Sequence, residues 1–131
     1  SNSGQLEVDV EDKADMILSK DDGLVAHLHM DFLQRKVTRS CKVIGEHGSL
    51  IWNLVENSIT FDSSKGSKTL FDESKVDRNT MYLNQLRHFM KVANGSASPS
   101  VGVSDALYVL QLIEVLRTSS NNNKPMSIRD M

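Results

Sequence analysis

Cysteine and aromatic residues are scarce in this chain of 131 residues. The single cysteine, Cys41, excludes an internal disulfide and indicates a reducing compartment, so we expect a cytoplasmic protein. The few aromatic residues do not alternate with clusters of basic residues. A nucleic-acid surface built on stacking and phosphate contacts is therefore not predicted.

An excess of charge of one sign is also missing. The formal net charge of -2 gives no electrostatic attraction to nucleic acid or to an anionic membrane. Purely apolar runs are only a few residues long, far too short for a membrane span. The start of the chain shows no charged segment followed by an apolar one, so no signal peptide is expected. We predict a protein whose partners include neither nucleic acid nor membrane.

The length predicts one domain. Residues 1–4 are interpreted as a tag remnant or disordered start, because Ser1-Asn2 is typical of the residues left by tag cleavage. Residues 5–131 are interpreted as the single domain.

Alternation of apolar and polar residues is typical of half-buried strands and dominates the first half of the chain. Asp21-Asp22-Gly23 predicts one hairpin turn, and Gly45 and Gly48 predict another. Residues 62–67 are expected to form a solvent loop. The expected strands are Gln5–Val10, Ala14–Ser19, Leu24–Leu33, Arg39–Ile44, Ser49–Leu54, Asn57–Phe61 and Lys68–Phe71.

Helical spacing replaces the alternation in the second half. One apolar stripe predicts a helix that stops at Asn94-Gly95; it consists of Tyr82, Leu86, Phe89 and Ala93. A second helix, apolar around much of its circumference, is expected to begin at Ser104 as N-cap. Residues 125–128 are a candidate last strand. The predicted fold is α+β: an open-faced, mostly antiparallel sheet of about six or seven strands, with two C-terminal helices packed on one face.

One face of the expected strand Leu24–Leu33 is crowded with ionisable groups. His27, His29 and Asp31 alternate along it and so share that face. The favoured interpretation is a solvated or subunit-interface face, with Arg39 as a further member. Ligation of zinc or iron is the alternative left open. Protonation of the histidines is expected to weaken self-association by like-charge repulsion.

Motifs that bind phosphate are not found. Gly45-Glu46-His47-Gly48 is followed by an expected strand, whereas a dinucleotide fingerprint needs a glycine-rich turn that opens a helix. Cys41 has no histidine at a spacing that would activate it as a nucleophile. We therefore assign no catalytic, cofactor-binding or metal-binding residue.

Several runs nevertheless resemble the C-terminal domain of the Gfo/Idh/MocA oxidoreductases. They are HLHMDFLQR from His27, VIGEHGSLIW from Val43, YLNQLRHF from Tyr82, SDAL from Ser104 and KPMSI from Lys124. The resemblance implies a parent protein with an N-terminal Rossmann domain that binds NAD or NADP. It also implies hydride transfer to or from a sugar, cyclitol or related alcohol, and subunit contact through the open face of the sheet.

The departures from that family set the expected role of this chain. Lys124-Pro125 lacks the preceding glutamate of the family's catalytic lysine motif, and no position matches the family's aspartate and histidine pair. The chain is therefore interpreted as a C-terminal substrate and dimerisation domain that is inactive alone and holds no cofactor. Its expected partners are the missing Rossmann domain and further copies of itself. The alternative is a stand-alone binding or assembly module with the same fold and no catalysis.

Overall fold

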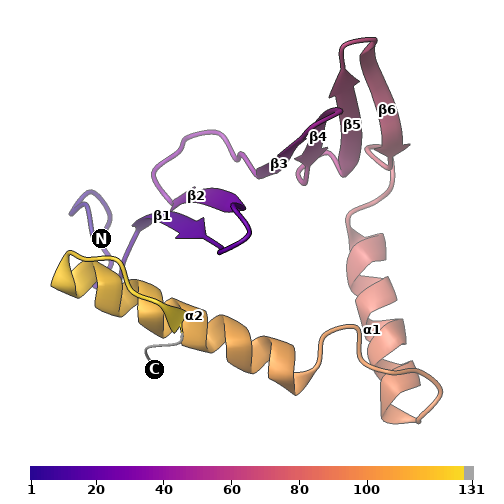
Figure 1. Ribbon diagram of the computed structural model, residues 1–131. Helices are drawn as coiled ribbons and strands as arrows, with labels where there is room; N and C mark the ends of the chain where they lie inside the picture. The colour runs from indigo at the N-terminus through magenta and orange to yellow at the C-terminus, as the bar shows by residue number, and fades with distance from the viewer. Residues whose placement is uncertain (129–131) are drawn as a thin grey trace. The chain divides into compact units, whose positions relative to one another are not determined.

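The computed structural model describes residues 1–128 and is α+β. It divides into two compact units, Ser1–Asp77 and the part that begins at Arg78. The first unit carries the strands and the second carries the helices (Figure 1). The predicted order of strands followed by helices is therefore confirmed.

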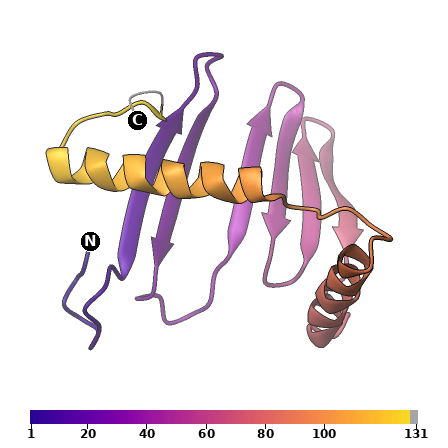
Figure 2. The ribbon, with the colours of Figure 1, turned by 90° about the horizontal axis from the view of Figure 1, so that it is seen from below.

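The strands form two antiparallel sheets. β1 (Lys13–Ser19) pairs with β2 (Val25–Asp31), and a four-stranded sheet has the order β3-β4-β5-β6. Consecutive strands lie side by side in each sheet (Figure 2). The strands of the larger sheet are β3 (Ser40–Gly45), β4 (Gly48–Asn53), β5 (Ser58–Ser63) and β6 (Gly66–Asp72).

The expectation of one open sheet of six or seven strands is wrong. The pairing stops between β2 and β3, where a longer connector replaces the tight turn that would set the two strands side by side. The backbone amides of Leu33 and Gln34 both donate to the carboxylate of Asp31, which turns the chain away from the strand direction.

The expected strand Gln5–Val10 is also absent. Local hydrogen bonds of side chains bend this segment. The side-chain Nδ2 of Asn2 donates to the carbonyl of Val8 at 3.0 Å. The amide of Ser3 donates to the nearly completely buried carboxylate of Asp12 at 2.9 Å. Such bonds compete with strand pairing.

Two further expectations are corrected. Residues 62–67 are largely strand, because β5 and β6 run up to a two-residue turn. Residues 125–128 do not form a strand.

The helices lie close to their expected positions. α1 (Asn79–Ala93) has Asn94 as its C-cap. Gly95 follows with a left-handed φ of 77°, and its backbone amide donates to the carbonyl of Val92. α2 (Val103–Asn122) begins one residue before the expected N-cap Ser104. Gly102 caps it instead, and its amide donates to the Asp105 carboxylate at 2.8 Å. The expected packing of both helices on one face of a sheet stays a prediction.

The strand register of the four-stranded sheet places most of its large apolar residues on one face, whereas Ile44 and Ile51 lie on the other. Cys41 lies opposite Trp52, and Trp52 lies opposite Ile59. The opposite face carries more polar residues, Thr60 and Thr69 among them. We call the first face the apolar sheet face and define it by Cys41, Val43, Leu50, Trp52, Ile59, Phe61 and Phe71. Such a face stabilises a fold only when it is covered.

Gly48 is the most closely surrounded glycine of the larger sheet. A Cβ there would lie 2.3 Å from the carbonyl oxygen of Asp62 and 2.7 Å from the ring of Phe61. Its φ of 153° is one that residues with a side chain rarely adopt. Only glycine therefore permits β4 to approach β5 this closely.

Replacing Gly48 by alanine is expected to lower the free energy of unfolding by about 1 to 3 kcal/mol, through backbone strain and the clash with Asp62. Gly45→Ala is the matched control in the same turn, because its Cβ would meet only the carbonyl of Gly48 at 3.7 Å. Urea unfolding of both variants measures the difference. Equal stability of the two variants would contradict this account of the turn.

Candidate functional site

The candidate site lies on the β1–β2 hairpin. The register pairs Asp15 with His29 and Lys13 with Asp31. Because alternate residues of a strand share a face, these four side chains and that of His27 lie together on one side of the hairpin. The sequence analysis placed His27, His29 and Asp31 on this face; the neighbouring strand adds Lys13 and Asp15.

His29 is held at both ring nitrogens. Its Nδ1 lies 2.5 Å from Oδ1 of Asp15 on β1, and its Nε2 lies 2.8 Å from Oδ2 of Asp31 on its own strand. An ionised carboxylate only accepts hydrogen bonds, so both nitrogens can donate at the same time only when the ring is protonated. The hydrogen bond to Asp15 first, and that to Asp31 second, raise the pKa of His29 above its ordinary value.

Asp31 is the most densely bonded carboxylate of the site. Besides His29 it accepts from the amides of Leu33 and Gln34, and from the side-chain Nε2 of Gln34 at 2.7 Å. Its side chain is only 6% exposed. Burial alone would raise its pKa, but these bonds, that of the Gln34 side chain foremost, lower the pKa of Asp31 to about 2.

Asp15 is the carboxylate on the other side of the His29 ring from Asp31. Hydrogen bonds from His29 first and from Lys13 second lower the pKa of Asp15 below its usual value. The Lys13 ammonium lies 3.3 Å from Asp15 Oδ2. The site is thus a chain of alternating charges that runs from Lys13 through Asp15 and His29 to Asp31.

Arg39 lies apart from this chain of charges. It directly precedes β3, and its carbonyl accepts from the amide of Leu54 at 2.9 Å beside the four-stranded sheet. The structure therefore brings His29 and Asp31 into contact and places His27 on their face, while Arg39 lies beside the other sheet.

Lys13, Asp15 and Gln34 are the members that the sequence analysis missed. The position of Asp15 could have been predicted from the sequence. Asp15 and His29 are equidistant in sequence from Asp22, at the centre of the predicted Asp21-Asp22-Gly23 turn. Counting outward from that turn gives the pairing. Gln34 had no such signal, since its position depends on the irregular path after β2.

Metal ligation is not supported by the arrangement around His29. Both of its nitrogens are already engaged by carboxylate oxygens of Asp15 and Asp31. Within residues 1–128, no group of three or more His, Cys, Asp or Glu side chains is arranged to hold one.

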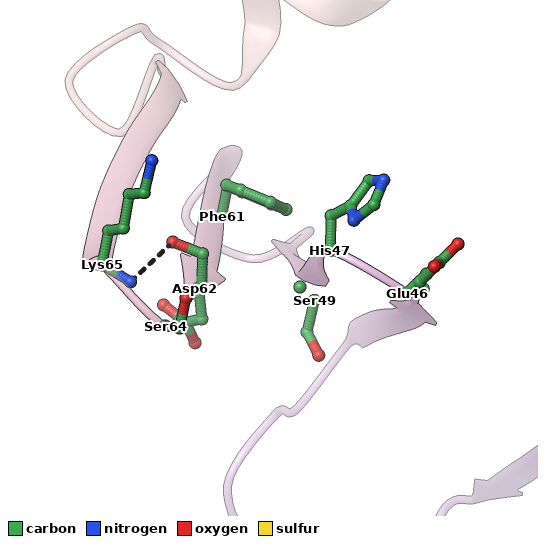
Figure 3. A pocket seen from close by; sticks show the side chains of 10 residues that line it. Glu46, His47, Ser49, Phe61, Asp62, Ser64 and Lys65 are labelled. Carbon is green, nitrogen blue, oxygen red and sulfur yellow. Dashed lines mark hydrogen bonds between the residues drawn. The ribbon is translucent and has the colours of Figure 1, made fainter.

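Two hollows lie outside this site. One, of about 740 Å³, lies where the β3–β4 and β5–β6 turns meet at one end of the larger sheet (Figure 3). His47, Phe61 and Lys65 are among its lining residues. The other, of about 500 Å³, lies beside α1, where the Ser100 hydroxyl is 3.0 Å from Nε2 of His88.

Comparison with known proteins gives no match: no family model, no curated protein and no solved structure corresponds to this chain. In residues 1–128, neither helix combines the length and hydropathy that a bilayer crossing needs.

Gln34→Ala is expected to raise the pKa of Asp31 from about 2 toward its ordinary value of 3.8, because the variant loses the strongest bond to that carboxylate. Carboxyl carbon shifts followed by NMR during an acid titration measure this pKa. Gln85→Ala, on α1, serves as the control and should leave the Asp31 titration unchanged. An unchanged titration in Gln34→Ala would contradict the assigned role of Gln34.

Proposed function

We propose that this chain is the C-terminal substrate and dimerisation domain of an NAD(P)-dependent oxidoreductase that acts on a sugar, cyclitol or related alcohol. The observation that carries the proposal is the ordered set of family-like runs. Four of the five fall on β2, on the β3–β4 hairpin, on α1 and at the start of α2, and the fifth follows α2. The α+β architecture and the apolar sheet face support it further, because a domain that contacts other subunits needs an apolar surface that a partner can bury.

The chemistry belongs to other residues in this proposal. NAD or NADP and the catalytic groups are supplied by a Rossmann domain of the parent protein, and the described chain supplies shape and subunit contact. A cytoplasmic location is proposed with it, on the single cysteine.

A stand-alone binding or assembly module is the second candidate. The apolar sheet face favours it, since this face gives a binding module its surface without requiring a cofactor domain. The coding sequence that precedes the segment separates the two candidates. A strand followed by a glycine-rich turn and a helix supports the enzyme.

Titration of this chain with NADH, followed by nicotinamide fluorescence, is expected to show no saturable binding at micromolar concentration. The parent protein with its Rossmann domain is the positive control. Saturable micromolar binding to the chain alone would refute the division of roles proposed here.

Self-association is proposed through the face that carries His27, His29 and Asp31. Ile17 lies opposite His27 on that face and is 73% exposed. A glutamate there would bring like charges together across a two-fold contact.

Ile17→Glu is therefore expected to shift the chain from dimer to monomer in light scattering. Val37→Glu is the matched control, because Val37 is also 73% exposed but lies in the connector after β2. A wild-type chain that is monomeric at all concentrations, or equal loss of dimer in both variants, would contradict this contact.

A further inference from the structure

The contact between β1 and β2 contains an interaction that depends on one proton. A neutral imidazole has a single N–H and therefore donates once. His29 lies within hydrogen-bond distance of carboxylate oxygens at both nitrogens, at 2.5 Å and 2.8 Å. Only the imidazolium satisfies both contacts.

Deprotonation changes the charge balance of the whole face. From β1, Lys13 and Asp15 face His29; from β2, His27 and Asp31 do so. With His29 protonated, two cations and two anions balance along the chain from Lys13 to Asp31. Without that proton, one ring nitrogen turns its lone pair toward a carboxylate oxygen, and two carboxylates share a single lysine.

The surrounding structure makes this change consequential. β1 and β2 form a two-stranded sheet of their own, and an isolated two-stranded hairpin is only marginally stable in water. Asp31 also holds the amides of Leu33 and Gln34, so the same bridge anchors the loop after β2. Loss of the hydrogen bonds of His29 therefore weakens both the pairing of β1 with β2 and the anchoring of this loop.

We propose that Asp15, His29 and Asp31 form a pH-operated latch. Protonated His29 closes β1 on β2 and fixes the start of the following loop, and loss of the proton releases both. This inference rests on the hairpin geometry and is independent of the proposed function.

The direction of the pH dependence follows from the pKa values. The pKa of His29 is raised, by the bond to Asp15 first and to Asp31 second. Its contribution to stability is therefore complete below the unfolded value of about 6.5 and is lost as the pH rises through the raised pKa. The lowered pKa values of Asp15 and Asp31 mean that their contribution is lost only in strong acid. The latch therefore opens on the alkaline side.

The expectation that histidine protonation weakens self-association concerns the contact between copies of the chain, and it stays a prediction. Within the hairpin, the two carboxylates make protonation of His29 neutralise the face.

Hydrogen–deuterium exchange of the full chain from about pH 6 to about pH 9 tests the latch. After correction for intrinsic exchange, peptides covering β2 and residues 32–34 should lose protection as His29 deprotonates. The loss should be about tenfold for each unit by which its pKa exceeds the ordinary value. Peptides of β3 and β4 are the internal reference and should show no such step.

His29→Gln should abolish the step, and His27→Gln, on the same strand and face, should keep it. A step that survives in His29→Gln, or that is missing from the wild type, overturns the proposal. If His29→Gln does not fold, long-range ¹H–¹⁵N spectra of the wild-type imidazole decide instead. A doubly protonated ring at about pH 7 supports the latch, and a neutral tautomer refutes it.

Discussion

Pairing between strands that are consecutive in sequence is the constraint on which the first unit of this protein depends. Each described ladder joins a strand to its next neighbour, so every sheet contact is closed by a short turn. Local pairing of this kind lowers the entropy lost in bringing strands together. It also makes each turn decisive, as Gly48 illustrates: the close approach of β4 to β5 is possible because that residue has no side chain.

The break between β2 and β3 follows from the same constraint. In the long connector between β2 and β3, the carboxylate of Asp31 accepts hydrogen bonds from two backbone amides, and β2 ends there. One side chain thereby ends β2, anchors the loop and binds His29. Local hydrogen bonding and cross-strand electrostatics meet at this carboxylate, and for that reason its pKa is the most strongly lowered value of the site.

The first unit presents two surfaces of different chemistry. The apolar sheet face offers hydrophobic area, which supplies most of the binding energy in protein contacts. The charged face of the β1–β2 hairpin offers direction and pH sensitivity instead. A chain with both surfaces is compatible with either proposed function, since the chemistry proposed for the parent enzyme lies in its cofactor domain.

The sequence by itself determined the local elements. Alternation predicted β1 to β6 within a few residues, and the stripe from Tyr82 to Ala93 predicted α1, because side-chain periodicity is fixed by backbone geometry. It also determined that His27, His29 and Asp31 share a face. It misjudged the Gln5–Val10 segment, where side-chain bonds from Asn2 and Ser3 outweigh an alternating pattern.

Only the tertiary structure decided what those elements pair with. The division into two sheets depends on the path of the chain after Asp31, and periodicity carries no information about that path. The protonation state of His29 depends on Asp15, which is distant in sequence and is brought within 2.5 Å by the strand register. A pattern along one strand reveals which face a side chain occupies, but its charge is set by the groups that folding places opposite it.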